Sequence, residues 1–194
     1  MFIVIEGPDG SGKTTVSKIL VEKLCEAGIN ARYTSEPTAS HYGKRLREML
    51  SDKTSTPKEL YDLFVLDRIE HLNEIDKWER CGEVVISDRY KYSTYCYQVS
   101  HGLDPALTAD NNALRKPDIT FILTADVDIL LSRIDSRALD KEIYETREFL
   151  EKITAMYAGL PEIFGEEFNY IDVDDTIDNI VSKAFEIIKE KAEK

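Results

Sequence analysis

The sequence has few cysteines and no long hydrophobic run. Its three cysteines, Cys25, Cys81 and Cys96, are widely spaced and form no Cys-x-x-Cys pair. Isolated thiols argue against a disulfide framework and a structural zinc site, so we expect ordinary packing or surface thiols. No apolar run approaches the roughly 18 residues that a membrane helix requires. The first residues, MFIVIEG, lack the basic region and cleavage site of a signal peptide, and we expect a cytoplasmic protein.

Basic residues are also in short supply. Lys and Arg total 25, against 37 Asp and Glu, and the net charge is −12. Because so acidic a chain repels polyanions, we expect no nucleic-acid partner. A small anionic ligand would have to be bound by cations gathered in one place.

Short apolar segments rich in β-branched residues alternate with longer helical ones. This alternation predicts an α/β protein in which a parallel sheet is covered by helices on both faces. A length of 194 residues, without an internal repeat or linker, favours a single domain, 1–194. We expect five strands, at 2–6, 31–35, 83–88, 119–124 and 168–173, and helices at 13–27, 42–52, 57–80, 91–101, 126–139, 142–159 and 177–192.

Two helix ends carry specific signals. Gly28 follows the first predicted helix, as expected of a C-terminal cap. The stretch Thr56-Pro57-Lys58-Glu59 combines a capping box with a proline at the first helical position.

Residues 7–15 read GPDGSGKTT and follow a predicted strand that ends at Glu6. A strand, a glycine-rich turn and a helix that begins at Lys13 form the context of a phosphate-binding loop. In such a loop backbone N–H groups face the phosphates, Lys13 adds a positive charge and the Thr14 hydroxyl binds Mg²⁺. A chance match is expected in roughly one chain in a hundred. We expect a nucleotide to contact Gly7, Pro8, Asp9, Gly10, Ser11, Gly12, Lys13, Thr14 and Thr15.

The segment EVVISDRY, residues 83–90, predicts a second part of the site. A buried strand ends at Asp88, and ligands bind at the carboxyl ends of strands in open α/β sheets. Asp88 is therefore placed to hold Mg²⁺ or its water, and Arg89 to face the phosphates. The alternative is a solvated charge pair at the end of a strand.

A phosphate-binding loop predicts a nucleotide but not a reaction. A guanine-nucleotide switch normally carries an Asn-Lys-x-Asp base reader, and the nearest string is Arg115-Lys116-Pro117-Asp118. An Asp-x-x-Gly switch element occurs only where Asp9–Gly12 overlaps the loop itself. A pure binding module would not explain the arginines outside the loop. These observations favour a kinase.

Two further stretches indicate an acceptor site. In LFVLDRIEH, Phe64 and Arg68 lie four residues apart on one helix face, where the ring and the guanidinium can bind a planar base. The alternative is a core aromatic residue beside an arginine that reaches along the surface. In DRYKYSTYCYQ, the helix beside Arg89 carries the acceptor-side residues Ser93, Thr94, Tyr97 and Gln98. The alternative there is a helix with a half-buried tyrosine face.

Together these motifs resemble the thymidylate kinase family over nearly the whole chain. The shared elements are GPDGSGKT, the Glu36-Pro37 pair, FVLDR, DRY with SxxxYQ, KPD before the fourth strand and an arginine-bearing lid. The resemblance implies the three-layer P-loop nucleoside monophosphate kinase fold and a homodimer. It also implies phosphorylation of dTMP to dTDP with ATP and Mg²⁺, a step of dTTP biosynthesis. The runner-up is a related P-loop kinase for another deoxynucleotide or deoxynucleoside.

Carried over by position, the resemblance implies roles for the acceptor-side residues. Phe64 would stack on thymine, Arg68 would bond its O4 edge and Gln98 would lie near the base. Asp9 would hold the sugar 3′-hydroxyl, and Tyr97 would lie against the 2′ carbon and favour deoxyribose.

The acceptor phosphate is assigned to Arg89. Many relatives have a further arginine beside the Glu-Pro pair, whereas here Ser35 and Thr38-Ala39 occupy that stretch. We therefore expect Arg45 or Arg47 to assist Arg89.

The resemblance also implies a lid at about 133–145. Its usual acidic-Arg-x-Glu pattern is replaced by Glu142-Ile143-Tyr144-Glu145, but LLSRIDSRALDK supplies Arg133, Arg137 and Lys141. Relatives of one type carry an arginine in the phosphate loop where this chain has Gly10, and the other type draws the charge from the lid. We expect Arg137 to stabilise the transition state and Arg133 to bind ATP; the alternative is a solvated rim of cations.

The catalytic residues expected from the sequence are thus Lys13, Arg89, Arg137 and Asp9. An arginine introduced at Gly10 is expected either to restore part of the rate that a variant lacking Arg137 loses or to obstruct the loop.

Overall fold

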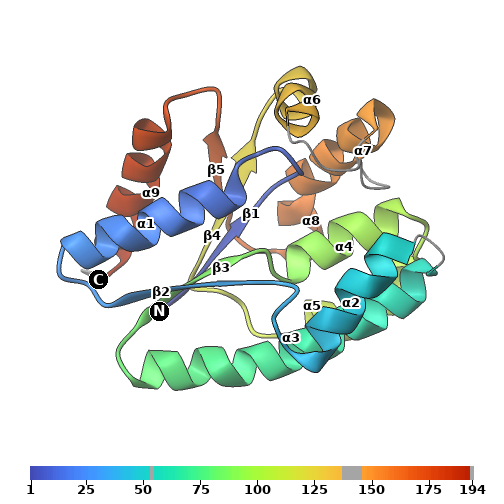
Figure 1. Cartoon of the computed structure of the whole chain (residues 1–194), viewed down its shortest axis with the longest axis horizontal. Coiled ribbons are helices and arrows are strands. Elements are labelled where there is room, and N and C mark those ends of the chain that lie inside the picture. Colours follow the sequence, from blue (N-terminus) through green and yellow to red (C-terminus); the bar gives the residue numbers. More distant parts are fainter. Residues whose placement is uncertain (53–54, 137–145, 193–194) are drawn as a thin grey trace.

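The computed structural model describes residues 1–52, 55–136 and 146–192 and contains a five-stranded parallel sheet. The strand order is β2-β3-β1-β4-β5 (Figure 1). The strands are β1 (Phe2–Glu6), β2 (Ala31–Ser35), β3 (Val84–Asp88), β4 (Ile119–Thr124) and β5 (Asn169–Asp172). The predicted α/β class and its five strands are confirmed, with each end within one residue of the expected position.

The helices flank this sheet on both faces. They are α1 (Lys13–Glu26), α2 (His41–Asp52), α3 (Pro57–Arg80), α4 (Lys91–Ser100), the 3₁₀ helix η1 (Pro105–Thr108), α5 (Ala109–Asn112), α6 (Val127–Asp135), α7 (Arg147–Ala158), α8 (Leu160–Phe164) and α9 (Ile177–Ala192). None of the described helices is long and apolar enough to span a membrane. All three cysteines are free, and Cys96 is the buried one.

Several helix boundaries differ from the prediction. The helix expected at 126–139 ends at Asp135, because Ser136 caps it in a turn. The helix expected from 142 begins at Arg147, where the Thr146 side chain accepts a hydrogen bond from Phe149 N. Residues 137–145 lie outside the described part of the chain. The short elements η1, α5 and α8 were missed, since four or five residues are too few to show a helical period.

The predicted cap signals are confirmed. Gly28 adopts φ 81° and its N–H donates to Cys25 O at 3.0 Å, which ends α1. At the start of α3 the Thr56 side chain accepts from Glu59 N, and the Glu59 side chain accepts from Thr56 N, with Pro57 at the first helical position.

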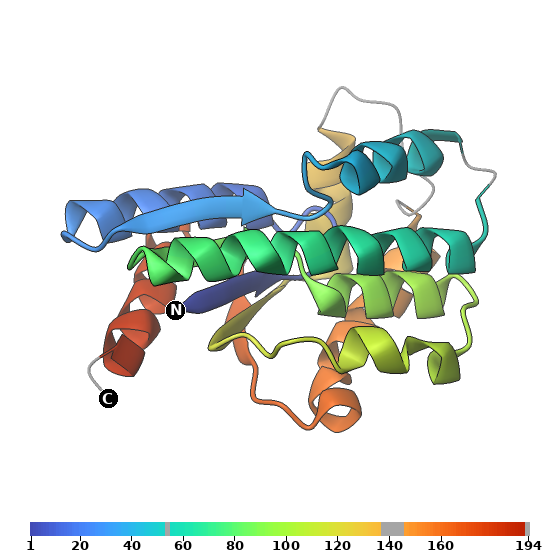
Figure 2. The same cartoon turned by 90° about the horizontal axis from the view of Figure 1, so that it is seen from below.

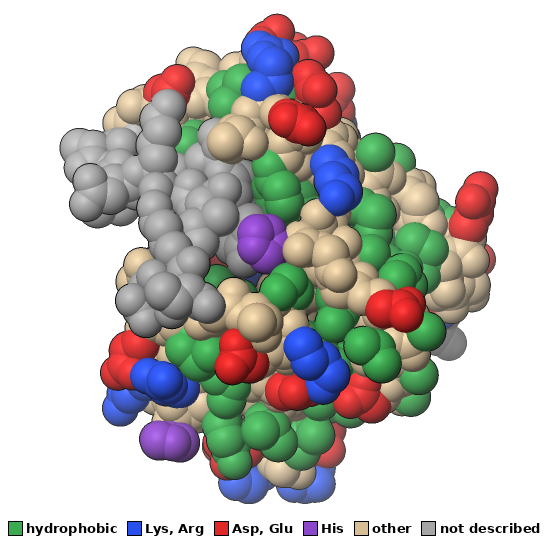
Figure 3. Space-filling model, turned by 90° about the vertical axis from the view of Figure 1, so that its right-hand side faces the viewer, with side chains coloured by type: hydrophobic (Ala, Val, Ile, Leu, Met, Phe, Trp, Pro, Cys, Tyr) green, Lys and Arg blue, Asp and Glu red, His purple; other side chains and the backbone are tan. Residues whose placement is uncertain are grey.

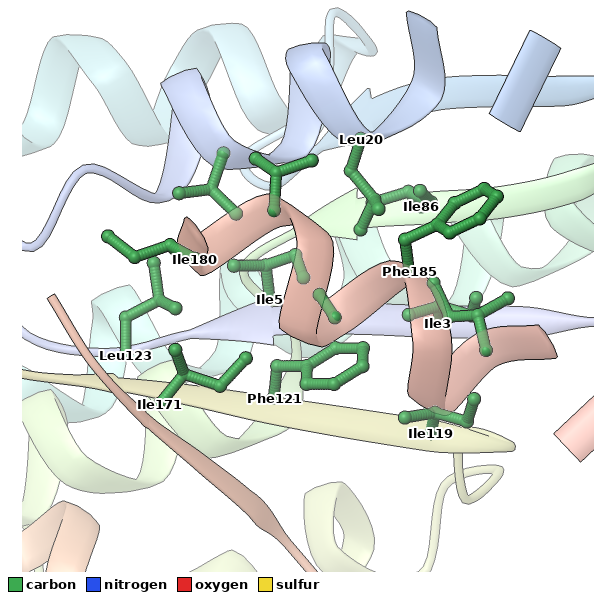
Figure 4. Packing of buried hydrophobic residues seen from close by; sticks show 14 of the residues in the cluster. Ile3, Ile5, Leu20, Ile86, Ile119, Phe121, Leu123, Ile171, Ile180 and Phe185 are labelled. Carbon is green, nitrogen blue, oxygen red and sulfur yellow. The ribbon is translucent and has the colours of Figure 1, made fainter. Parts of the chain in front are cut away.

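The core forms two layers, one on each face of the sheet. On one face Ile3 and Ile5 of β1 pack with Leu20 of α1 and with Ile180 and Phe185 of α9 (Figure 4). On the other face the alternate β1 residues Phe2 and Val4 pack against α3, α4, α7 and α8. There α3 lies between α2 and α4 (Figure 2). Because β1 is buried on both sides, its sequence is continuously apolar up to Glu6.

The strand register determines where the motifs meet. Asp88, the last residue of β3, is aligned with Ile5 on one side and Ser35 on the other. The phosphate-binding loop leaves β1 directly after Glu6, so it emerges beside Asp88. The carboxyl edge of the sheet therefore brings together the phosphate-binding loop after β1, Asp88 with Arg89 after β3, and the Glu36-Pro37 pair after β2.

Candidate active site

The loop between β1 and α1 has a backbone that requires glycine at two close approaches. Gly7 has φ +143°, and a Cβ added there would lie 2.5 Å from Leu123 O. Gly10 has φ +84°, and its Cβ would lie 2.7 Å from Leu130 O in α6. Of the two outcomes expected for an arginine at Gly10, this geometry favours obstruction of the loop, because a side chain there collides with helix backbone.

Lys13 is folded against the loop. Its Nζ donates to Pro8 O at 2.8 Å and lies 3.9 Å from Asp9 Oδ1, with only 6% of the residue exposed. Burial, reinforced by the charge of Arg89, lowers the pKa of Lys13 to about 8. A phosphate group that replaced Pro8 O as the partner of Lys13 would favour the charged amine and raise this pKa.

Thr14 and Asp88 meet across the sheet edge. Thr14 Oγ1 donates to Asp88 Oδ2 at 2.5 Å, and Tyr33 OH approaches the same oxygen at 3.4 Å. Asp88 Oδ1 is buried without a hydrogen-bond partner among the described residues. A hydroxyl and a carboxylate with an unused oxygen suit Mg²⁺, which binds through few protein ligands and completes its shell with phosphates and water. The described residues contain no group of three or more His, Cys, Asp or Glu placed to hold a metal.

Arg89 links β3 to the loop. Its Nη2 is ion-paired with Asp9 Oδ1 and its Nη1 donates to Ser93 Oγ at 3.0 Å. Burial by itself would lower the pKa of Arg89, but Asp9 together with Tyr97, Tyr157 and Asp88 outweighs it, and the pKa stands well above the usual value. Burial would likewise raise the pKa of Asp9, but Arg89 and Lys13 hold it below its usual value. Both groups are therefore charged at neutral pH.

Tyr97 completes this cluster. Its hydroxyl donates to Asp9 Oδ2 at 2.8 Å and accepts from Asp9 N at 3.1 Å. The guanidinium of Arg89 lies over its ring, 5.2 Å from the centroid. Asp9, Arg89 and Tyr97, which the sequence assigned to the acceptor's sugar and phosphate, are thus in direct contact.

Arg68 lies in a buried network that the sequence did not predict. It is 1% exposed, and its Nε and Nη2 donate to Glu36 Oε2 at 2.9 and 2.5 Å. Nη2 also donates to Thr94 Oγ1 at 2.8 Å, and Nη1 donates to Asn111 Oδ1. Most of its donors are therefore engaged within the protein, and its bond to a base stays a prediction. The Glu36-Pro37 pair, joined by a cis peptide bond, was the available signal for Glu36.

The other predicted acceptor-side residues differ in exposure. Phe64 is half-buried on α3, while Gln98 is 2% exposed. Gln98 Oε1 has no hydrogen-bond partner among the described residues, which leaves it available to a ligand. Ser93 is buried beside Arg89.

The two arginines of α2 have different surroundings. Arg45 is exposed and pairs with Glu48 at 3.1 Å. Arg47 donates to Pro37 O at 2.5 Å and Thr38 O at 2.8 Å. The structure therefore places Arg47, and not Arg45, against the loop that follows Glu36.

The same loop is anchored by Asp67 of α3. This carboxylate, 1% exposed, accepts from Thr38 N and Thr38 Oγ1 at 2.8 and 2.5 Å and from Ser40 Oγ at 2.6 Å. A cavity of about 570 Å³ opens next to it, lined by Thr34, Thr38, Ala39, Ser40, Glu70, His71, Asn73, Glu74, Lys77 and Trp78. None of the predicted site residues lines this cavity.

The predicted lid lies mostly outside the described residues. Arg133 Nη2 donates to Val173 O at 3.0 Å, which holds this cation beside β5. Arg137 and Lys141 belong to the segment 137–145, so their placement is not described. On the side of the molecule drawn in Figure 3, the described acidic and basic side chains are intermixed with hydrophobic ones.

The segment Arg115-Lys116-Pro117-Asp118, which most resembles a guanine-binding motif, is bonded to the start of β1. Asp118 Oδ2 accepts a hydrogen bond of 2.6 Å from Phe2 N, at the start of β1 and so at the opposite edge of the sheet from the phosphate-binding loop. This location is unsuitable for base recognition and argues against a guanine-nucleotide switch.

Comparisons with known proteins show the family of this chain. A family model described as Thymidylate kinase matches residues 5–184. A probable thymidylate kinase of Methanocaldococcus jannaschii is 42% identical over 190 residues, which cover 97% of this chain and 94% of the relative. This chain belongs to the thymidylate kinase family.

Other thymidylate kinases extend the comparison. The thymidylate kinase of Brachyspira hyodysenteriae is 32% identical over 191 residues, covering 97% of this chain and 93% of that protein. A solved structure of thymidylate kinase from Candida albicans matches with a TM-score of 0.80 at 26% identity, covering 98% of this chain and 92% of that one. The predicted family and its P-loop nucleoside monophosphate kinase fold are therefore confirmed, and membership makes the chain a kinase of the transferase class.

Proposed function

We propose that this chain transfers a phosphoryl group from ATP to the 5′-phosphate of dTMP and forms dTDP, in dTTP biosynthesis. The observation that carries the proposal is the contact of Arg89 and Tyr97 with Asp9, a residue of the phosphate-binding loop. This contact brings Arg89 and Tyr97 against the loop that would hold the donor, and so supports the roles proposed for them at the acceptor.

The loop would bind ATP through its backbone N–H groups and Lys13. Mg²⁺ would be held by Thr14 and Asp88 together with phosphate oxygens, and when bound it would neutralise phosphate charge. Arg89 would bind the acceptor phosphate, and Asp9 would accept the sugar 3′-hydroxyl. In this arrangement the protein supplies position and charge, which phosphoryl transfer chiefly requires.

Thymine would lie between Phe64 and the helix that carries Gln98. Arg68 has a proton on Nη1 beyond the one given to Asn111, and this proton could reach the O4 edge. We also propose that residues 1–194 act as one domain, with a lid at about 133–145 in which Arg137 stabilises the transition state and Arg133 binds ATP.

An ADP-release assay with dTMP, dUMP, dCMP, dGMP, AMP and thymidine tests the acceptor. We expect dTMP to give the highest kcat/KM; a higher value for another compound would establish the runner-up, a kinase of related specificity. Lys13→Ala should lower turnover at least about hundredfold, because the loop loses its charge on the transferring group. Lys18→Ala, at an exposed lysine five residues further along α1, is the matched control and should stay active.

We propose that the enzyme is a homodimer. Leu66 and Ile69, 42% and 45% exposed, lie three residues apart on one face of α3, and such apolar faces are typical of interfaces. Sedimentation should show a dimer that Leu66→Glu with Ile69→Glu converts to a monomer. Leu107→Glu, at a residue 50% exposed in η1, should leave it dimeric. The cytoplasmic location stays a prediction from the sequence.

A further inference from the structure

Glu6, the last residue of β1, is a fully buried carboxylate that no proposed ligand contact uses. Its Oε1 accepts from Tyr90 N at 2.8 Å and Ser93 N at 3.0 Å. Its Oε2 accepts from Ser93 Oγ at 2.5 Å and Tyr157 OH at 3.0 Å. Burial raises the pKa of Glu6, and the rise is opposed by the hydroxyl and N–H of Ser93, the charge of Arg89 and the Tyr157 hydroxyl. Burying a carboxylate is costly unless hydrogen bonds compensate it, and the four donors around Glu6 supply that compensation.

Two of these bonds cap α4. The N-cap residue of this helix, Tyr90, makes no side-chain capping bond of its own. Glu6, on the neighbouring strand β1, instead accepts the hydrogen bonds of the N–H groups of Tyr90 and Ser93. The helix dipole favours a negative charge at this end of α4. Glu6 therefore fixes the residues immediately after Arg89.

The backbone of Arg89 is held in an unfavourable conformation. Its φ is 74°, in the left-handed region that residues with a Cβ seldom adopt. Arg89 N donates to Ile5 O at 3.0 Å, and Arg89 O accepts from Ser87 Oγ at 2.8 Å. Such a conformation persists only where surrounding contacts hold the backbone in place. Glu6 provides these contacts on the α4 side, through its bonds to Tyr90 N and Ser93 N.

The side chain of Arg89 is held through Ser93. The Ser93 hydroxyl has one hydrogen, which points to Glu6 Oε2 at 2.5 Å. Its oxygen is therefore left as an acceptor for Arg89 Nη1 at 3.0 Å. We propose that Glu6 is a positioning residue for Arg89, acting through the Ser93 hydroxyl and the capped start of α4. The inference rests on the proposed role of Arg89 at the acceptor phosphate.

A double-mutant cycle with Glu6→Gln and Arg89→Ala tests the proposal. Glutamine keeps one oxygen for the backbone donors, but its amide nitrogen cannot accept the Ser93 hydrogen. We expect Glu6→Gln to lower kcat/KM for dTMP at least about tenfold, as misplacement of a contact residue does, with KM for ATP unchanged. In the Arg89→Ala background the same change should cost less than about twofold, since the two effects are coupled.

Each outcome bears on the proposal. An equal loss in both backgrounds would overturn it, because a general structural effect is independent of Arg89. Normal kcat/KM in Glu6→Gln would overturn it as well. A fully active Arg89→Ala enzyme would overturn the role of Arg89 and this inference together, whereas an impaired one with additive effects would overturn only the inference.

Two further variants complete the test. If Glu6→Gln does not fold, Ser93→Ala takes its place in the cycle. This variant keeps the backbone hydrogen bond to Glu6 and removes only the hydroxyl. Additive losses of kcat/KM in Ser93→Ala and Arg89→Ala would then reject the proposal. Glu166→Gln is the matched control for a lost carboxylate. Glu166 accepts from Tyr92 OH at 2.5 Å and Lys91 Nζ at 3.1 Å but makes no hydrogen bond to Ser93 or to the backbone at the start of α4, and kcat/KM should stay near normal.

Discussion

The Tyr97 hydroxyl donates a 2.8 Å hydrogen bond to Asp9 Oδ2, joining residues 88 positions apart in the sequence. The ring predicted to exclude ribose therefore also holds the carboxylate predicted to bind the sugar 3′-hydroxyl. These two contributions, bulk and hydrogen bond, can be separated by substitution.

Tyr97→Phe keeps the bulk and removes the hydrogen bond. We expect kcat/KM for dTMP to fall by a factor equivalent to about 0.5–1.5 kcal/mol, with the preference for deoxyribose over ribose unchanged. Tyr97→Ala should relax that preference, because bulk near the 2′ carbon is lost. Kinetics with dTMP and its ribose counterpart measure both. An unchanged ratio in Tyr97→Ala would remove Tyr97 from the role.

The lowered pKa of Lys13, about 8, predicts a pH dependence. Phosphate binding needs the protonated amine, so kcat/KM for ATP should fall as the pH rises through about 8 in the free enzyme. Bound phosphates favour the charged form, and kcat at saturating ATP should therefore hold to higher pH. Rate profiles from pH 6 to about 10 test this; Lys18→Ala should give the same profile. A kcat/KM that stays flat through pH 9.5 would contradict it.

Phe64→Ala should weaken dTMP binding by about 1–3 kcal/mol, the range found for lost base–aromatic stacking. Calorimetric titration with dTMP measures this loss, and ATP affinity should hardly change. The melting temperature is the control, because Phe64 is half-buried. Unfolding of the variant would show that Phe64 is a core residue.

Arg137→Ala should lower kcat at least about tenfold with little change in dTMP affinity, as loss of a transition-state contact does. Arg133→Ala is the matched comparison, since Arg133 donates to Val173 O and is expected to affect ATP binding more than kcat. If Arg137→Ala keeps a normal kcat, the role passes to Arg133.

Gly10 and Gly12 provide a matched pair for the loop backbone. Both have positive φ, 84° and 86°, but a Cβ at Gly10 meets Leu130 O at 2.7 Å and one at Gly12 meets nothing within 4 Å. Gly10→Ala should therefore lose about 1–3 kcal/mol more unfolding free energy than Gly12→Ala, the usual cost of overpacking. Denaturant melts compare the two, and equal losses would show that φ strain dominates.

The sequence by itself determined the features that depend on neighbouring residues. The strand and helix pattern, the capping box at Thr56 and the glycine-rich loop after Glu6 all follow from hydrophobic period and local backbone preference. The meeting of Thr14 with Asp88 could also be expected, since parallel strands share one carboxyl edge. Helix ends near 136 and 146, and the short η1, α5 and α8, could not, because caps and single turns leave little periodic signal.

The tertiary structure decided the partners of the buried charges. Glu6 looked like the end of an apolar strand, yet it bonds Ser93 across 87 residues, and Arg68 reaches Glu36 across 32. Arg47, rather than Arg45, meets the loop after Glu36 for the same reason. A buried charge is stable only where donors from several elements converge, and that convergence depends on strand order and helix packing rather than on local sequence.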